Sequence, residues 1–271
     1  MNFEELGPQE EAPELSELFE ELKLERILSG FTDITSKISI DYKHIETTPP
    51  ELNNTFTLLR NLSQQGPSIA VSDINGDGLD DFFTGSDPGQ PSAWFMQKAD
   101  NTFLQKKFEK EKPYEDMGSL LFDADGDGDP DLYVVSGGSA EAVSSDIYQD
   151  RLYLNDGNGN FIQDYSALPE IRSSGSCVTG CDFDLDGDLD LFVGGRIFPG
   201  KYPSSPKSYL LENTGGKFTD KSILLDNTGG LIGVVNSALW TDINLDGLPD
   251  LIVAGEWMPV KIFINNGNVY I

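Results

Sequence analysis

Short apolar runs separated by turn residues recur along the chain from Gly66 onward. A run such as Ile69-Ala70-Val71 leads into an acidic loop, and a second run such as Leu132-Tyr133-Val134-Val135 leaves it. Glycines follow, and after a variable insertion a third apolar run leads through a turn into a fourth. Four short strands joined by turns predict an antiparallel meander sheet, and several such units predict an all-β fold of the propeller type. The four units cover about residues 66–107, 117–163, 175–220 and 233–271.

A nine-residue acidic loop lies between the first and second predicted strands of each unit. In its third copy, which runs from Asp182 to Asp190, carboxylates occupy positions 1, 3, 5 and 9 and glycine occupies position 6. Alternate residues that point inward around a tight glycine turn are how a short loop surrounds a hard cation with oxygen ligands. So much like charge in one loop is costly unless a cation lies within it. The other copies begin at Asp73, Asp123 and Asp242, and repeats of this length are typical of propeller blades.

Each loop is therefore predicted to bind one calcium ion, so about four ions would bind the chain. Position 7 is expected to contribute its backbone carbonyl, which leaves the side chain of Asp188 free to face solvent, and position 9 is expected to be a bidentate ligand. The predicted ligands are Asp73, Asn75, Asp77, Leu79 and Asp81; Asp123, Asp125, Asp127, Asp129 and Asp131; Asp182, Asp184, Asp186, Asp188 and Asp190; and Asp242, Asn244, Asp246, Leu248 and Asp250.

Other loop types and other cations fit this pattern less well. An EF-hand loop would carry a glutamate at position 12 between flanking helices, whereas position 12 here lies within predicted strands, at Thr84, Val134, Val193 and Val253. Magnesium prefers a smaller octahedral shell with more water, and zinc prefers histidine or thiolate ligands, which the loops lack. We interpret the ions as structural, because a cation would neutralise the aspartates and fix the hairpin that each loop closes.

Charge and composition limit the classes of partner. The chain has 271 residues with 18 Lys and Arg against 46 Asp and Glu, a net charge of −28. This charge argues against nucleic acid or an anionic membrane as a partner, and no apolar stretch is long enough to span a membrane. Cys177 and Cys181 would lie roughly 13 Å apart along a strand, beyond disulfide reach, so we expect small buried thiols.

Little in the sequence indicates an enzyme. His44 is the single histidine, and no serine lies in a nucleophile-elbow pattern. The paired carboxylates belong to the predicted metal loops, and no phosphate-binding glycine loop is present. One alternative is a propeller that degrades polysaccharide, with catalytic residues such as Tyr202 or Arg196. A purely structural spacer in a larger surface protein is a further alternative.

The N-terminal part of the chain differs from the repeats. Residues 1–29 are acidic and contain apolar residues at helical spacing, which predicts a short helical or irregular segment. Residues 30–65 are expected to carry the outer strand of a preceding or closing blade, followed by an irregular connection. This expectation rests on the likeness of Gly30-Phe31-Thr32-Asp33 to Gly216-Lys217-Phe218-Thr219-Asp220 in the third unit.

The combined motifs resemble a known family. The acidic loop, the apolar strand with Gly-Gly, the strand of the type Leu152-Tyr153-Leu154-Asn155 and the Gly-x-Phe turn together resemble the FG-GAP or VCBS-type repeat over residues 66–271. That family includes the propeller of integrin α subunits. The resemblance implies a calcium-binding β-propeller that is secreted or displayed on a cell surface and acts in binding and adhesion. Because seven blades are common in the family and no signal peptide is present, we expect the four blades to be part of a larger ring whose other blades are missing here.

The face opposite the acidic loops is the predicted ligand surface. In an up-down blade, the first-to-second and second-to-third connections lie at opposite ends of the strands, so the longer variable loops share the second end. Exposed aromatic residues with arginine are typical of binding surfaces, and we expect this face to bind a protein or a glycan. The candidate ligand-binding residues are Tyr114, Tyr148, Arg196, Phe198, Tyr202 and Trp257.

Overall fold

The computed structural model describes residues 31–38, 40–45, 66–108, 112–138 and 146–267. Contacts divide the chain into two compact units, residues 1–38 and 39–271. The helix predicted within residues 1–29 lies outside the described residues. Within the described ranges, no helix has the length and apolar character that a membrane crossing requires.

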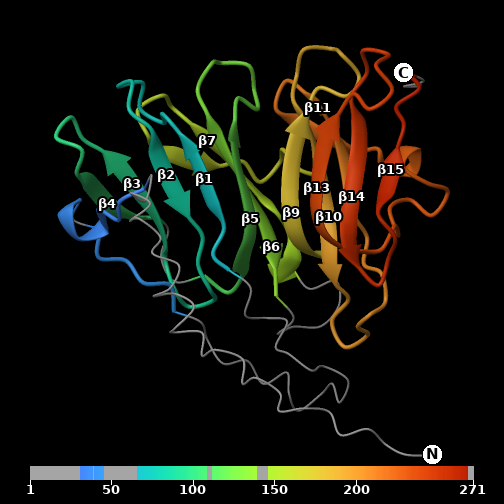
Figure 1. Ribbon diagram of the computed structural model, residues 1–271, viewed down its shortest axis with the longest axis horizontal. Coiled ribbons are helices and arrows are strands. Elements are labelled where there is room, and N and C mark those ends of the chain that lie inside the picture. Colours follow the sequence, from blue (N-terminus) through green and yellow to red (C-terminus); the bar gives the residue numbers. More distant parts are fainter. Residues whose placement is uncertain (1–30, 39, 46–65, 109–111, 139–145, 268–271) are drawn as a thin grey trace, which may run out of the picture. The chain divides into compact units, whose positions relative to one another are not determined.

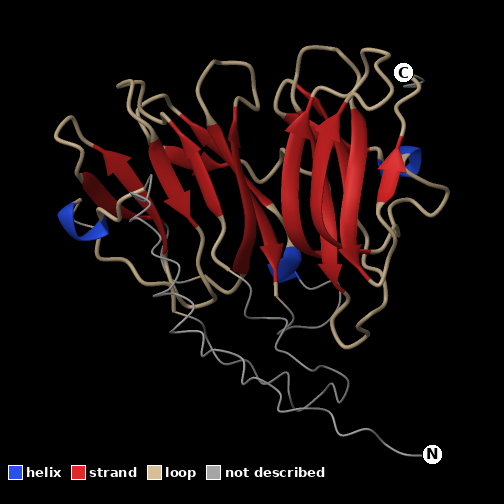
Figure 2. Ribbon diagram, viewed as in Figure 1, coloured by secondary structure: helices blue, strands red, loops and turns tan. Residues whose placement is uncertain are grey.

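The described residues between 66 and 267 form four antiparallel sheets, which follow one another in chain order (Figure 1) and are connected by loops (Figure 2). The strands are β1 (Ile69–Ser72), β2 (Asp81–Thr84), β3 (Ser92–Gln97) and β4 (Phe103–Phe108) in the first sheet; β5 (Glu115–Phe122), β6 (Asp131–Gly137), β7 (Arg151–Asn155) and β8 (Phe161–Gln163) in the second; β9 (Ser174–Cys181), β10 (Asp190–Ile197), β11 (Tyr209–Thr214) and β12 (Lys217–Asp220) in the third; and β13 (Val234–Thr241), β14 (Asp250–Glu256) and β15 (Lys261–Phe263) in the fourth.

The strand order confirms the all-β prediction and the meander within each unit. Every acidic loop connects the first and second strands of its sheet, as the spacing predicts. The fourth sheet differs from the prediction of four strands, because it has three among the described residues. Its fourth strand would fall on residues 268–271, which lie outside the described part of the chain.

The second strands of the second and third sheets contact both neighbouring sheets through alternate residues. In β6, Leu132 and Val134 lie in an apolar cluster with Trp94 of the first sheet, whereas Tyr133 and Val135 lie in a cluster shared with the third sheet. These four residues of β6 are fully buried. Burial on both faces explains why the strand reads as an unbroken apolar run instead of an alternating one.

The fourth sheet keeps this alternation, but one of its faces has no neighbour among the described sheets. Leu251 and Val253 are buried against the third sheet. Leu239 and Ile262, which flank Ile252 in register on the other face, are each 50% exposed. The described sheets therefore do not close into a ring, and the seven-bladed propeller stays a prediction.

An asparagine near the C-terminal end of the third strand ties each later sheet to the one before it. Its side-chain Nδ2 donates to the backbone carbonyl of the second residue in the preceding acidic loop. The three hydrogen bonds are Asn155 to Ile74 (2.9 Å), Asn213 to Ala124 (2.8 Å) and Asn265 to Phe183 (2.7 Å). A buried carbonyl needs such a partner, so these bonds fix how neighbouring loops are spaced.

First strands of neighbouring sheets contact each other at small residues. A Cβ added to Gly118 of β5 would lie 3.1 Å from the carbonyl oxygen of Ser176 and 3.2 Å from Cα of Cys177 in β9. Glycine therefore permits the close approach of the two backbones. Cys177 and Cys181 in β9 are free thiols as expected, but they are half-buried, whereas the sequence predicts that they are buried.

Within residues 31–38, the chain has the same local structure as the segment that follows β12. Asp33 Oδ1 accepts the backbone N–H of Thr35 at 2.9 Å, just as Asp220 Oδ1 accepts that of Ser222 at 2.9 Å. In both places a 3-10 helix follows, η1 (Thr35–Lys37) and η4 (Ser222–Leu224). The predicted likeness of the two segments thus extends to their turns, while the outer strand proposed for residues 30–65 stays a prediction.

The asparagine bonds predict a measurable loss of stability on substitution. Asn213→Ala leaves the carbonyl of Ala124 without this donor, so we expect the free energy of unfolding in urea to fall by about 1–3 kcal/mol. Asn158→Ala is the matched control, because that exposed side chain donates only within its own turn, to the carbonyl of Asp156. Equal stability of the two variants would contradict the role given to Asn213.

Candidate functional site

Each acidic loop folds around the carboxylate of its first aspartate. In the second loop, Asp123 Oδ1 accepts the backbone N–H of Gly126 at 2.8 Å, and Oδ2 accepts that of Gly128 at 3.0 Å. The position-6 glycines of the other loops donate to the first aspartate in the same way. All four of these glycines have φ between +84° and +104°, a conformation that favours glycine. The local sequence pattern thus sets the shape of the loop.

The last aspartate of each loop is fully buried where the second strand begins. Asp190 Oδ2 accepts the backbone N–H of Phe183 at 3.0 Å in its own loop, and Oδ1 accepts that of Asn213 at 2.8 Å near the end of the third strand. Burial raises the pKa of Asp190 to about 7 and that of Asp131 to about 6, even though backbone N–H groups oppose this rise. A carboxylate held in such a place is unfavourable without a nearby positive charge.

Carboxylate oxygens converge in two of the loops. One oxygen each from Asp123, Asp125 and Asp127 lie within 4.8 Å of one another. The same holds for Asp182, Asp184 and Asp190, so positions 1, 3 and 9 of the third loop are brought together. In the first and fourth loops the third position is asparagine, and its amide oxygen accepts the N–H of position 5 at 3.0 Å.

The donor set fits a hard cation such as calcium. The converging groups are carboxylates, and carboxylate, amide and carbonyl oxygens are the ligands that calcium takes in proteins. Each oxygen of Asp190 accepts one backbone N–H and retains a lone pair for a cation. The loops contain no histidine or cysteine, which zinc would require.

The side chain at position 7 contacts the turn between the third and fourth strands. Asp188 Oδ2 accepts the backbone N–H of Gly215 at 2.8 Å, so the side chain is not simply directed to solvent as expected. The Asp129 carboxylate likewise lies close to Gly157, in the corresponding turn of the second sheet. This contact links the two turns at one end of a sheet and leaves the position-7 carbonyl as the group that could face a cation.

Position 4 of every loop has left-handed backbone, a requirement that sequence reasoning missed. Gly76 and Gly126 occupy it in the first two loops, with φ of +70° and +82°. Leu185 and Leu245 occupy it in the last two, with φ of +63° and +62°. A side chain in this conformation costs roughly 1–2 kcal/mol, so the third and fourth loops are strained at one residue each.

The candidate ligand residues at the opposite end of the sheets differ widely in exposure. Tyr148 and Arg196 are buried, whereas Trp257 is 77% exposed. Phe198 lines a cavity of about 440 Å³ that also contacts Arg172, Lys207 and Tyr209. Arg196, Tyr202 and Trp257 come together around Glu256. Tyr114 lies apart from these, with the Arg151 guanidinium carbon 3.9 Å from its ring centre.

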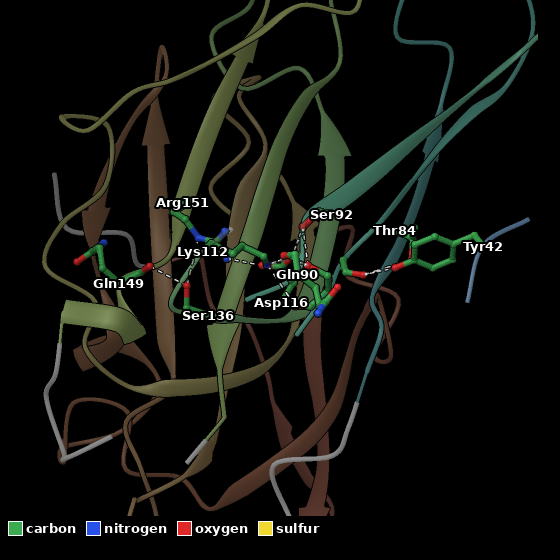
Figure 3. A network of polar contacts seen from close by, with 11 residues as sticks. Tyr42, Thr84, Gln90, Ser92, Lys112, Asp116, Ser136, Gln149 and Arg151 are labelled. Carbon is green, nitrogen blue, oxygen red and sulfur yellow. Dashed lines mark hydrogen bonds and ion pairs between the residues drawn. The ribbon is translucent and has the colours of Figure 1, made fainter. Parts of the chain in front are cut away.

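A buried polar network joins the first and second sheets (Figure 3). Asp116 of β5 accepts Arg151 Nη2 at 2.7 Å, Ser92 Oγ at 2.6 Å and the backbone N–H of Ser86 at 3.0 Å, and it pairs with Lys112 Nζ. Burial acts to raise the pKa of Asp116, but the charges of Arg151 and Lys112 outweigh it and lower the pKa to about 2. These residues follow no repeat spacing, so the sequence offered no signal for the network.

Comparison with known proteins places the first three acidic loops in a repeat family. A family model described as FG-GAP-like repeat matches residues 73–134 and 123–193, which contain the first three loops. No curated protein matches the chain.

Two similar solved structures share only a loose resemblance with this chain. One is an Agrocybe aegerita lectin described as recognising non-reducing terminal N-acetylglucosamine, with 18% identity, a TM-score of 0.43 and coverage of 74% of this chain and 52% of the lectin. The other is the V. cholerae biofilm matrix protein Bap1, with 18% identity, a TM-score of 0.35 and coverage of 75% and 29%. The chain thus spans about half of the first protein and less than a third of the second, and likenesses this weak carry no functional conclusion.

The strained leucine at position 4 predicts a stabilising substitution. Leu245 is 87% exposed and has φ of +62°, so Leu245→Gly should raise the free energy of unfolding by about 1 kcal/mol, because strain is relieved at little loss of packing. Leu248→Gly in the same loop is the control and should destabilise the protein, since that position is not left-handed. Chemical denaturation measures both variants. Destabilisation by Leu245→Gly would argue against strain at this residue.

The buried Asp116 predicts a particular dependence of stability on acid. Its folded-state pKa of about 2 lies below the ordinary value of 3.8, so the ionised carboxylate stabilises the fold above about pH 4. Roughly 2 kcal/mol of the free energy of unfolding is lost as the pH falls towards 2 and the carboxylate takes up a proton. Asp116→Asn should lower the free energy of unfolding at pH 7 by about 3–5 kcal/mol and flatten this acid dependence. The exposed Asp41→Asn is the control. An acid profile of Asp116→Asn as steep as that of the parent would refute the assignment.

Proposed function

Because residues 73–193 belong to the FG-GAP-type repeat family, we propose that the chain is a calcium-binding module of a secreted or cell-surface protein. Its role is to present a binding surface for a protein or glycan ligand, with structural calcium ions in the acidic loops. The observation that supports this most directly is the convergence of Asp182, Asp184 and the buried Asp190 within 4.8 Å.

The residues that would hold the cations also join the strands. Calcium, when bound, supplies the positive charge that the clustered carboxylates call for. Asp190 connects its own loop to the third strand through the N–H groups of Phe183 and Asn213. Asn213 in turn reaches the preceding loop at the carbonyl of Ala124. Order in one loop is therefore coupled to the spacing between its own sheet and the preceding one.

The propeller arrangement is part of the same proposal. Support for it comes from the contacts between successive first strands, β1 with β5, β5 with β9 and β9 with β13. The repeated asparagine bond between neighbouring sheets is a second support. We propose that further blades of a longer chain cover the exposed face at Leu239 and Ile262, as in a ring of about seven blades. The role proposed is non-enzymatic, because the paired carboxylates are assigned to cations.

Calcium should stabilise the folded chain selectively. We expect thermal unfolding to shift to higher temperature in millimolar calcium relative to EGTA, with magnesium having a smaller effect, and calorimetry to find about four ions per chain. For a single site, calcium at 100 times its Kd adds about 2.7 kcal/mol of stability. Asp190→Asn should remove one ion from the stoichiometry.

The matched control is Asp188→Asn in the same loop, because the Asp188 side chain contacts Gly215 and its expected ligand atom is the backbone carbonyl. This variant should retain the full stoichiometry. A chain whose unfolding is the same in calcium and EGTA, or equally shifted by magnesium, would contradict the proposed function.

A further inference from the structure

Trp257 occupies a position that neither packing nor backbone preference explains. It follows β14 with φ of +56°, a left-handed conformation that is an outlier for a bulky side chain. The side chain is 77% exposed, so the indole gains little from burial. Strained residues that persist in exposed places are concentrated at binding sites, where the surrounding structure holds them.

Hydrogen bonds to the third sheet and its loop hold the indole in place. Trp257 Nε1 donates to the hydroxyl of Tyr202 at 2.7 Å, and this hydroxyl donates to Glu256 Oε2 at 2.6 Å. The buried Arg196 at the end of β10 donates from Nη2 to Glu256 Oε1 at 3.0 Å. Because Tyr202 belongs to the β10–β11 loop, the indole edge is tied towards the third sheet and not to the open face of the fourth. An indole anchored by its edge keeps its ring face open.

The geometry points to a binding site for a neutral sugar residue formed by Trp257, Tyr202 and Glu256. The C–H face of a pyranose ring stacks on the open indole, while hydroxyl groups at its rim reach the Glu256 carboxylate and the Tyr202 oxygen, whose lone pairs can accept further hydrogen bonds. One apolar platform with a few fixed polar groups is the usual composition of a small-molecule site. This inference rests on the proposed binding role and names the ligand class.

Charge and size favour a neutral sugar over other ligands. The net charge of −28 opposes acidic glycans, and the Arg196 charge is already paired with Glu256. The same ion pair reduces the attraction of Glu256 for a cationic ligand. A protein interface of standard size buries about 800 Å² on each partner, whereas a single exposed ring with two adjacent polar groups matches one sugar unit.

The test first applies the calcium-saturated full chain to an array of neutral and sialylated oligosaccharides. A glycan that binds is then titrated into the chain, and tryptophan fluorescence measures its binding. Trp94 is buried and Trp240 is half-buried. A fluorescence change on glycan binding that is absent in Trp257→Phe therefore comes from the exposed indole of Trp257. We expect a neutral glycan to bind, Trp257→Ala to weaken binding at least tenfold, and Tyr202→Phe to weaken it less.

Tyr165→Ala is the matched control, because this tyrosine is 87% exposed and lies in the connection after β8, at the same end of the sheets. It should bind the glycan as the parent does, and all variants should keep the parent melting temperature and calcium stoichiometry. Unchanged binding by Trp257→Ala, preference for sialylated glycans, or no bound glycan while calcium still stabilises the chain would overturn the sugar site. Sugar binding without any calcium response would instead contradict the proposed calcium role and leave this site standing.

Discussion

A carboxylate buried at the start of each second strand is the constraint on which the rest of the structure depends. Asp81, Asp131, Asp190 and Asp250 are fully buried, although each belongs to a loop rich in other acids. Burial raises the pKa of Asp131 to about 6 and that of Asp190 to about 7, which shows how unfavourable these charges are without a cation. The same buried aspartates therefore both close the hairpin between the first two strands and favour a bound metal ion.

The two ends of the sheets are joined by different chemistry. At the acidic-loop end, one asparagine bond is repeated from sheet to sheet, because every loop presents the same carbonyl at position 2. At the other end, the first and second sheets are joined through Ser92 and Asp116, whereas the third and fourth are joined through Arg196 and Glu256. The repeated end suits a structural role common to all sheets. The varied end is where residues are free to differ, so a ligand site such as that at Trp257 belongs there.

The sequence by itself determined the strands, the loops and the all-β class of this protein. Apolar runs on both sides of each acidic nonamer place β1, β5, β9 and β13 before the loops and the second strands after them, as the structure has them. Glycine at position 6 and aspartate at positions 1 and 9 specify the loop through hydrogen bonds between residues at most seven positions apart. Such contacts are local, so their residue types recur at fixed spacing and can be read from one chain.

Only the tertiary structure decided which distant residues meet. Asn213 and Ala124 are 89 residues apart, and no local spacing connects them. The same is true of Tyr202 and Trp257, which the sequence suggested as separate candidates and the fold joins through one hydroxyl. Burial also depends on packing between sheets, so Tyr148 looked like a surface residue in the sequence but is fully buried. Local hydrogen bonds determine the structure of each repeated loop. Contacts between sheets determine which side chains of the variable loops are exposed, because the neighbours of a side chain in these loops come from distant parts of the chain.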